Sequence, residues 1–279
     1  MTASGSKAAR RRPTSSARPP EAGEGSWDHV ASWYDTLAGD RGTEFHETVI
    51  VPGVIRLLDL QRGESVLDLA CGQGVMSRTL HRRGGRVTAV DISPQLIEIA
   101  QGRSSKGIRY QVGDVRDLSF LGDDTFDAAV CVLAAQNIEP MEPLFMGSAR
   151  HLRPWGRMVV VVSHPAFRIP RQSSWQWDET RKLLFRAVDR YLSPLKIPID
   201  MRPFQRPGQE LTWTYHRPLQ AYVTALAAAR LWINAVEEWP SPKVSQPGRT
   251  ARGENRARAE FPLFLAIRAV LVPPQSSDR

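Results

Sequence analysis

Residues 65–74 read Ser-Val-Leu-Asp-Leu-Ala-Cys-Gly-Gln-Gly, and this stretch decides the fold. The apolar run at residues 65–70 predicts a short buried strand. Gly72 and Gly74 then permit a tight turn with close backbone approach, and the pattern of residues 74–83 predicts a helix directly after it. A strand, a glycine-rich turn and a helix in this order are typical of the first unit of a doubly wound α/β sheet.

The alternation of strands and helices continues along the chain. Further strands are predicted at residues 86–91, 107–111, 126–132, 157–163, 232–238 and 263–272. Helices are predicted at residues 27–37, 43–60 (bent or broken at Pro52), 95–101, 141–152 and 219–231. Strands that alternate with helices imply a mainly parallel sheet with helices on both faces. We therefore expect an α/β fold with a doubly wound sheet.

Residues 165–210 interrupt this alternation between the fifth and sixth strands. They contain Trp175, Trp177, several prolines and a stretch near residues 179–191 that we predict to be helical. A compact insertion of this kind favours a lid over a site rather than a linker. We expect one domain over residues 26–279, with residues 1–25 as a disordered basic tail.

The net charge of +8 is concentrated in two segments of the 279-residue chain. Residues 1–25 hold five basic and two acidic residues, and residues 239–258 hold five basic residues and one acidic residue. A nucleic-acid-binding protein usually spreads basic residues over one face, so a nucleic-acid partner is not expected. Two cysteines without metal-ligand spacing, no signal peptide and no apolar run that spans a bilayer favour a cytoplasmic protein without a membrane span.

The glycine turn carries features that distinguish between cofactors. Ser77 stands where the dinucleotide fingerprint requires its third glycine. Asp68 precedes the glycines, where a carboxylate would repel a pyrophosphate and tolerate a cationic amino-acid ligand. Asp91 ends the second strand, where a carboxylate can accept hydrogen bonds from ribose hydroxyls. These positions argue against a nicotinamide dinucleotide.

Five ordered motifs resemble those of class I S-adenosylmethionine-dependent methyltransferases, in particular the small-molecule branch of ubiquinone and menaquinone enzymes (methyltransferase type 11). They are LDLACGQG (67–74), VTAVDIS (87–93), VGDVRDL (112–118), FDAAVCVLAAQNI (126–138) and LRPWGRMVVV (152–161). The resemblance covers about residues 27–163. It implies a Rossmann-like sheet of seven strands, the last antiparallel, and S-adenosyl-L-methionine as cofactor.

The resemblance also implies roles for individual residues. Asp68, Gly72 and Gly74 would lie beside the methionine part of the cofactor, and Asp91 would bind the ribose. The adenine would contact Ile92, Asp114 and Val115, while Val132 and Leu133 would line the methyl-transfer side. Tyr34 is similar to a residue of the N-terminal helix that closes over the cofactor, and the alternative role for Tyr34 is ordinary packing. For Asp114 the alternative role is to cap a turn.

Acceptor-binding residues are expected where strands end on the carboxyl side. His164 directly follows the fifth strand, which makes it a candidate general base, with a local structural hydrogen bond as the alternative. The candidate acceptor contacts are Gln136, Asn137, Arg168, Arg171 and His216. Arg249, Arg252, Arg256 and Arg258 either join a site for an acidic acceptor or form a solvated helical turn. No metal is predicted, because methyl transfer from a sulfonium requires none.

The predicted function is methyl transfer to a small-molecule acceptor, either acidic or phenolic. An RNA or protein methyltransferase is the enzymatic alternative, although the Asn/Asp-Pro-Pro-aromatic segment of some amino-group methylases is absent from residues 132–136. A non-catalytic cofactor-binding module is the alternative of another class. The sequence does not indicate an oligomeric state.

Overall fold

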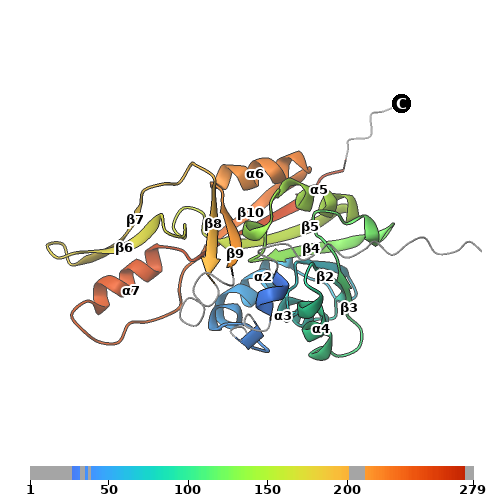
Figure 1. Ribbon diagram of the computed structural model, residues 1–279, viewed down its shortest axis with the longest axis horizontal. Coiled ribbons are helices and arrows are strands. Elements are labelled where there is room, and N and C mark those ends of the chain that lie inside the picture. The colour runs from blue at the N-terminus through green and yellow to red at the C-terminus, as the bar shows by residue number, and fades with distance from the viewer. Residues whose placement is uncertain (1–26, 32–34, 37–38, 201–210, 274–279) are drawn as a thin grey trace, which may run out of the picture.

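The structure is a computed structural model, and it describes residues 27–31, 35–36, 39–200 and 211–273. Its centre is a seven-stranded sheet with the order β10-β11-β5-β4-β1-β2-β3 (Figure 1). The strands of this sheet are β1 Ser65–Leu69, β2 Arg86–Asp91, β3 Arg109–Val112, β4 Phe126–Val132, β5 Leu152–Ser163, β10 Leu231–Trp239 and β11 Phe264–Leu271.

The pairing of the strands confirms the predicted topology. The pairs β1–β2, β1–β4, β2–β3 and β4–β5 are parallel. The last strand, β11, is antiparallel to both β5 and β10. In the central register Asp68 lies between Ala89 and Val130, so the carboxyl ends of β1, β2 and β4 meet at one edge of the sheet.

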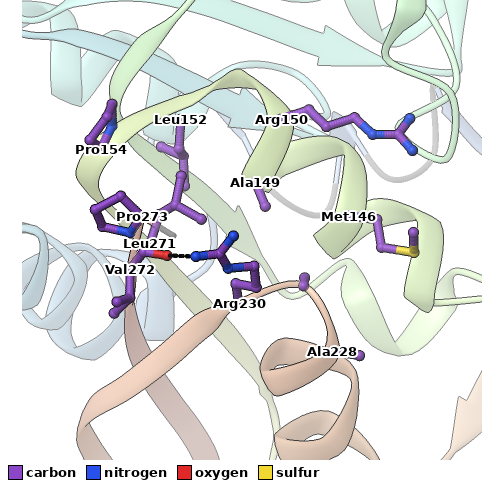
Figure 2. A pocket seen from close by; sticks show the side chains of 11 residues that line it. Met146, Ala149, Arg150, Leu152, Pro154, Ala228, Arg230, Leu271, Val272 and Pro273 are labelled. Atoms are coloured by element: carbon purple, nitrogen blue, oxygen red, sulfur yellow. Dashed lines mark hydrogen bonds between the residues drawn. The ribbon is translucent and has the colours of Figure 1, made fainter. Parts of the chain in front are cut away.

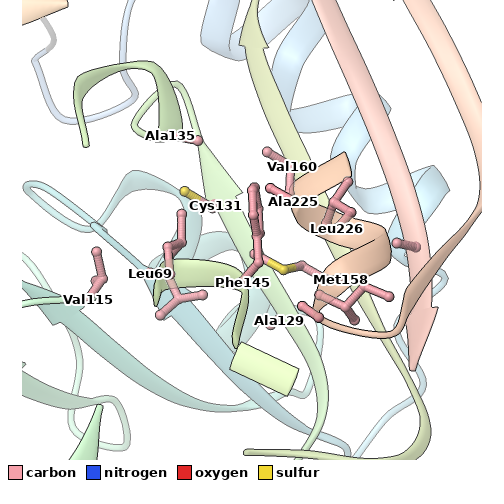
Figure 3. Packing of buried hydrophobic residues seen from close by; sticks show 14 of the residues in the cluster. Leu69, Val115, Ala129, Cys131, Ala135, Phe145, Met158, Val160, Ala225 and Leu226 are labelled. Carbon is pink, nitrogen blue, oxygen red and sulfur yellow. The ribbon is translucent and has the colours of Figure 1, made fainter. Parts of the chain in front are cut away.

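Helices cover both faces of the sheet (Figure 1). They are α2 Val51–Leu58, α3 Val75–Arg82 and α4 Pro94–Gly102 on one side, and α5 Glu142–His151 and α6 Leu219–Ala228 on the other. Neighbouring residues of β1 point to opposite faces: Val66 packs with the cluster under α2 and α3, and Leu67 with the cluster under α5 and α6. Figure 3 shows the second cluster, with Phe145 from α5, Leu226 from α6 and Met158 from β5.

The segment before β1 is helical, with a change of helix type in its middle. The short helix η1 spans Trp27–Val30, and the π-helical segment η2, His46–Ile50, leads directly into α2. Pro52 lies at the start of α2. Because proline lacks a backbone N–H donor, it disturbs the hydrogen-bond ladder of the preceding turn. The helix predicted over residues 43–60 therefore continues through Pro52, and it changes from a π-helix to an α-helix just before this proline.

The insertion after β5 is built from hairpins, which corrects part of the sequence interpretation. Strands β6 Ser173–Asp178 and β7 Leu183–Val188 pair antiparallel, as do β8 Leu195–Asp200 and β9 Leu211–His216. The helix predicted near residues 179–191 is wrong. Leu184 lies opposite Trp177 and Arg186 opposite Trp175, and such cross-strand pairs with aromatic residues override a weak helical pattern.

Candidate active site

A cavity of about 500 Å³ opens at the carboxyl ends of β1, β2 and β4. We call it the cofactor cavity. Its lining includes six of the predicted cofactor residues: Gly72, Asp91, Ile92, Asp114, Val115 and Val132. The predicted residues thus come together in space, although they lie on four different strand-to-helix connections. This is the edge at which open α/β sheets bind ligands.

Asp91 organises the glycine turn. It is 5% exposed, and its carboxylate accepts hydrogen bonds from the backbone N–H groups of Gly72 at 2.7 Å and Ser93 at 3.0 Å. Burial raises the pKa of Asp91, and the two backbone donors oppose that rise. Gly74 does not line the cavity; it caps α3 with φ of 82°, which favours glycine. Its role is therefore in shaping the turn.

Asp68 lies in a smaller hollow that adjoins the cofactor cavity. Both spaces are lined by Ala70, Gly72 and Val132. Burial and the charge of Asp91 together raise the pKa of Asp68 to about 7, against the hydrogen bond that it accepts from Ser77. Two buried carboxylates that resist ionisation in the free protein form a site that a cation would stabilise.

The far end of the cofactor cavity combines an apolar surface with a carboxylate. Ile92 and Val115 line it beside Asp114. Arg116 donates to both carboxylate oxygens of Asp114 through its side chain, and its Nη1 donates to the carbonyl of Glu139 at 2.6 Å. Arg116 therefore fixes Asp114 at the cavity wall and ties it to the segment after β4.

Backbone strain also marks this edge of the sheet. Ala70 after β1 and Leu133 after β4 adopt positive φ values of 53° and 54°, and both line the cofactor cavity. Residues other than glycine rarely adopt a positive φ, and those that do concentrate at functional sites. The Leu133 carbonyl accepts hydrogen bonds from the side chains of Gln136 at 2.9 Å and Asn137 at 3.4 Å, so the strained turn orients both amides.

A second cavity, of about 250 Å³, lies beside the first. We call it the acceptor cavity. Gln136, Asn137 and Tyr215 line both cavities and form their common wall. Tyr215 comes from β9, which is held to the turn after β4 by the hydrogen bond from Thr214 Oγ1 to the Gln136 carbonyl at 3.4 Å. Four of the predicted acceptor contacts, Gln136, Asn137, Arg168 and His216, therefore lie together.

The two candidate histidines differ in what their ring nitrogens contact. His216 lines the acceptor cavity, and its Nε2 contacts the Tyr191 carbonyl at 2.7 Å. A carbonyl only accepts, so Nε2 carries the hydrogen and, in the neutral ring, Nδ1 keeps its lone pair. His164 does not line this cavity: its Nδ1 accepts from the Ala166 N–H and its Nε2 bonds to Glu238 at 2.6 Å.

This geometry corrects the interpretation of His164 as a general base. The ring is 5% exposed, stacks on Phe167 at 4.8 Å between centroids, and uses both nitrogens in local bonds. Burial lowers the pKa of His164, and the bond to Glu238 opposes that change. The ring has no free lone pair for a substrate proton, so His164 supports the exit of β5.

Several other predicted arginines lie away from both cavities. Arg171 is exposed and donates to the Pro198 carbonyl at 3.4 Å, so its assignment as an acceptor contact is corrected. Helix α7, Ala251–Glu260, packs near β7, and Gly253 lies against the Trp177 ring. Arg249 pairs with Glu179 and Arg258 with Glu254. The solvated helical turn is thus the interpretation that fits this segment, and no arginine of it lines the two cavities of the described chain.

Some lining residues were not identified from the sequence. His46 lines the cofactor cavity from η2, and the backbone N–H of Thr43 donates to its Nδ1 at 3.2 Å. Burial lowers the pKa of His46. Tyr215 and Arg217 flank His216, so the segment that supplied one predicted residue was a signal for the other two. Tyr34 and residues 1–25 lie outside the described residues.

A third cavity, of about 360 Å³, lies at the opposite end of the sheet, where β5 begins and β11 ends. Figure 2 shows its lining, with Met146 from α5, Leu152 from β5 and Arg230 from the turn after α6. Arg230 Nη2 donates to the Val272 carbonyl at 3.0 Å. Its lining residues offer no carboxylate, histidine or hydroxyl, and they lie far from the predicted cofactor residues. It is not the candidate active site.

The fold and the cofactor cavity together define a class of protein. A doubly wound sheet with a glycine turn after β1, a buried carboxylate at the end of β2 and an Asp-Val pair after β3 fits an adenosyl ligand with a cationic amino-acid part. Residues 66–156 match the family model described as a methyltransferase domain. This stretch is therefore similar to a methyltransferase domain, as the resemblance to class I S-adenosylmethionine-dependent methyltransferases implied.

Similar proteins agree with this assignment. The chain is 37% identical to a demethylmenaquinone methyltransferase of Tropheryma whipplei over 113 residues, which are 39% of this chain and 46% of the relative. It is 31% identical to a ubiquinone biosynthesis O-methyltransferase of Xanthomonas oryzae over 129 residues, 45% of this chain and 54% of the relative. The chain thus spans about half the length of these curated relatives.

Solved structures match a larger share of the chain. An S-adenosylmethionine-dependent methyltransferase from Mesorhizobium loti superimposes with a TM-score of 0.63 and 26% identity, covering 78% of this chain and 96% of that one. In the part of the chain that the structure describes, no helix has the length and apolar character needed to cross a membrane.

Proposed function

We propose that this protein transfers a methyl group from S-adenosyl-L-methionine to a small molecule bound in the acceptor cavity. The observation that carries the proposal is the wall formed by Gln136, Asn137 and Tyr215, which lines both cavities. A common wall between two adjacent cavities allows two ligands to approach each other. Orientation of this kind supplies much of the rate in a reaction with a reactive methyl donor.

The acidic residues support the cofactor half of the proposal. Asp68 and Gly72 would hold the methionine part, Asp91 the ribose, and Ile92, Asp114 and Val115 the adenine. The cofactor carries a positive sulfonium, and the buried carboxylates Asp68 and Asp91 are complementary to it in charge. When bound, S-adenosylmethionine supplies an electrophilic methyl group to the nucleophile of the acceptor.

His216 is the residue that we propose as the general base, in place of His164. Its Nε2–H is fixed on the Tyr191 carbonyl, which orients the ring and leaves Nδ1 to accept a proton. An acceptor hydroxyl or phenol loses a proton as its oxygen bonds to the methyl carbon, so a base of this kind accelerates the transfer. A base of this kind supports a phenol or another hydroxyl compound as the acceptor, and the phenol is one of the two classes that the sequence suggested.

The size of the acceptor cavity favours a small molecule over RNA or protein. Its volume of about 250 Å³ lies below the ~300–1,000 Å³ typical of drug-sized ligands. The demethylmenaquinone and ubiquinone relatives are named for small molecules, whereas a Streptomyces relative that is 40% identical over 109 residues is named a cypemycin N-terminal methyltransferase. A macromolecular acceptor would require a single nucleotide or side chain to enter this cavity.

Calorimetric titration with S-adenosylmethionine and S-adenosylhomocysteine tests the proposal. We expect micromolar binding, about −8 kcal/mol, that is lost in Asp91→Ala and retained in Glu98→Ala, an exposed acid on α4. NADH serves as the control ligand and should not bind. Binding of NADH in place of the sulfur ligands, or equal binding by both variants, would contradict the assignment of the cavity.

A screen of phenols and carboxylic acids for release of S-adenosylhomocysteine then tests transfer. Turnover with a small phenol or acid is the expected result. A protein that binds the cofactor and methylates only RNA or protein would support the enzymatic alternative. One that binds the cofactor and methylates neither class would be a cofactor-binding module.

A further inference from the structure

The acceptor cavity holds an unusual concentration of polar atoms without partners. In the described part of the chain, four buried side-chain nitrogen or oxygen atoms have no hydrogen bond, and three of them belong to residues that line this cavity: Gln136 Oε1, Arg168 Nε and Arg217 Nη1. Burying an unpaired polar atom costs free energy, and folded proteins leave few of them. Three in one cavity indicate a site prepared for the polar groups of a ligand.

The charge of the described lining residues is positive. Arg168 and Arg217 both line the acceptor cavity, and no carboxylate is among the described residues that line it. Arg217 is 8% exposed; its Nη2 donates to the Ile138 carbonyl at 2.6 Å and bonds to Glu139, whose half-exposed side chain lines the cofactor cavity. The other terminal nitrogen of the same guanidinium, Nη1, is the atom without a hydrogen bond.

Arg168 is held nearby without an acidic partner in the lining. Its guanidinium lies over the Trp175 ring, 5.8 Å from the centroid. Burial, together with the positive charge of Arg186, lowers the pKa of Arg168 to about 10. Arg168 is half-buried with its Nε buried and unpaired, and a partly desolvated cation that lacks a carboxylate partner is favoured by a ligand that supplies the negative charge. Guanidinium groups recognise carboxylates and phosphates through paired N–H donors.

We infer that the acceptor is an organic anion, a carboxylate or phosphate ester, whose charged oxygens are bound by Arg168 and Arg217 while Gln136 Oε1 accepts a hydrogen bond from a hydroxyl or N–H of the same molecule. This inference rests on the proposed function, because it assigns the class of acceptor to the same cavity. It favours an acid over a neutral phenol as the methyl acceptor.

The lining also sets the direction in which the anion is bound. Gln136 and Asn137 line both cavities, whereas Arg168, His216 and Arg217 line the acceptor cavity alone. The reacting hydroxyl therefore lies toward Gln136 and the cofactor, and the anionic group lies toward the arginines. When bound, S-adenosylmethionine would supply the methyl group to the hydroxyl oxygen, and the electron pair of its carbon–sulfur bond would stay with sulfur. The hydroxyl proton would pass to His216, which lines the acceptor cavity next to the shared-wall residue Tyr215.

The test is a calorimetric titration of the full chain in the presence of S-adenosylhomocysteine, with three probes of one shape. The anionic probes are 4-hydroxybenzoate and 4-hydroxyphenyl phosphate, and 4-hydroxybenzyl alcohol is the neutral one. We expect at least one anion to bind about tenfold or more tightly than the alcohol, and the preferred anion distinguishes a carboxylate from a phosphate site.

Three variants then identify the side chains that bind the anionic group of the probe. Arg217→Met and Arg168→Met should each weaken binding of the preferred anion by about 10- to 100-fold and leave the alcohol unchanged, since each removes charge-assisted hydrogen bonds. Arg150→Met, an exposed arginine on α5 beside the third cavity, is the matched control and should bind as the wild type does. Arg168→Met keeps the Arg217–Ile138 bond, so its loss of binding cannot come from the loosening of that segment.

The outcomes separate the two proposals. Equal binding of alcohol and anions, or anion binding that survives both arginine changes, would overturn the inference, even if S-adenosylhomocysteine binds normally. Arginine-dependent anion binding together with no binding of S-adenosylhomocysteine would leave the anion site in place and defeat the proposed methyl transfer.

Discussion

The two adjacent cavities differ in charge and in the way the chain builds them. The cofactor cavity and its adjoining hollow contain the buried acids Asp68 and Asp91, and the acceptor cavity contains the half-buried Arg168 and the buried Arg217. Both pairs are costly in the free protein, because each places like charges in a poorly hydrated setting. The pairs are complementary to a cationic cofactor on one side and an anionic acceptor on the other.

The two cavities also differ in sequence range. The cofactor residues lie at the ends of four neighbouring strands, β1 to β4, so each lies within a short local motif. The acceptor residues come from the turn after β4, the exit of β5 and the segment from β9 to α6, and they meet only because the insertion folds back on η4, Ala135–Asn137. The difference suggests that cofactor binding depends on local turns and acceptor choice on the insertion.

The largest expected effect distinguishes the role of His216 from that of His164. His216→Gln keeps an N–H donor for the Tyr191 carbonyl and removes the proton acceptor, so kcat should fall about 100-fold with unchanged cofactor affinity. His164→Gln should change kcat by about twofold or less while lowering the free energy of unfolding by ~1–2 kcal/mol, because it disturbs the buried bond to Glu238.

Steady-state kinetics with an acceptor found by the screen, together with urea unfolding of both variants, provides the measurement. A larger loss of kcat in His164→Gln than in His216→Gln would restore the interpretation based on sequence position alone.

Alanine substitutions at two glycines test the turn that follows β1 beside the cofactor cavity. In Gly74→Ala the new Cβ would lie 2.4 Å from the Tyr110 hydroxyl, at a φ that alanine avoids. We expect a loss of about 2 kcal/mol or more in the free energy of unfolding. Gly102→Ala, at the end of α4, meets no atom within 4 Å and should be neutral or slightly stabilising, by up to about 1 kcal/mol.

Urea unfolding followed by circular dichroism compares the glycine variants. Equal midpoints for the two would show that the turn relaxes without cost. In folded Gly74→Ala protein the anion probe should bind as in the wild type, since the acceptor cavity does not include this turn.

The contrast between the cavities also explains how much the sequence could predict. The alternation of strands and helices follows from local patterns. The antiparallel last strand and the cofactor residues Gly72, Asp91 and Asp114 were implied by the family resemblance, and these residues lie together because strand ends in a parallel sheet converge. The hairpin β6–β7 was missed because its stability comes from pairing across the turn, such as Trp177 with Leu184, rather than from periodicity within residues 179–191.

Side-chain roles that depend on contacts distant in sequence were also beyond prediction. His164 follows β5 as expected, but Glu238, 74 residues later, occupies its Nε2. Arg217 is buried against the Ile138 carbonyl, 79 residues earlier, and the sequence marked it only through its neighbour His216. Position at a strand end identifies the edge of the sheet, and the tertiary partners decide which side chains remain available there.

The pH dependence of cofactor binding is the next smaller effect. The pKa of Asp68 is raised to about 7 by burial, so the carboxyl is protonated below that pH in the free protein. A cationic ligand favours the ionised form, so affinity for S-adenosylmethionine should fall by up to about tenfold per pH unit below 7 and level off above it. Binding at pH 7 should release protons, seen as different heats in buffers of different ionisation enthalpy.

Asp68→Asn should remove this dependence and weaken binding at pH 8. Because the raised pKa makes the ionised carboxyl a cost to folding above pH 7, the same variant should be more stable than the wild type at pH 8, by ~1 kcal/mol or more. A wild-type affinity that is flat between pH 6 and 8 would exclude Asp68 as the titrating group.

Ser77→Ala gives the smallest effect and the finest test of the acidic site. The Ser77 hydroxyl donates to Asp68 Oδ2 and favours its ionised form. Its removal should raise the pKa of Asp68 further and move the midpoint of the affinity profile to higher pH by about one unit or less, a few-fold loss of affinity at pH 7. Ser148→Ala is the matched control, because this buried serine donates to the Leu144 carbonyl within α5, remote from Asp68. A midpoint that moves equally in both variants would assign the shift to general destabilisation, whereas a shift confined to Ser77→Ala would tie the charge of the cofactor side to this one hydroxyl.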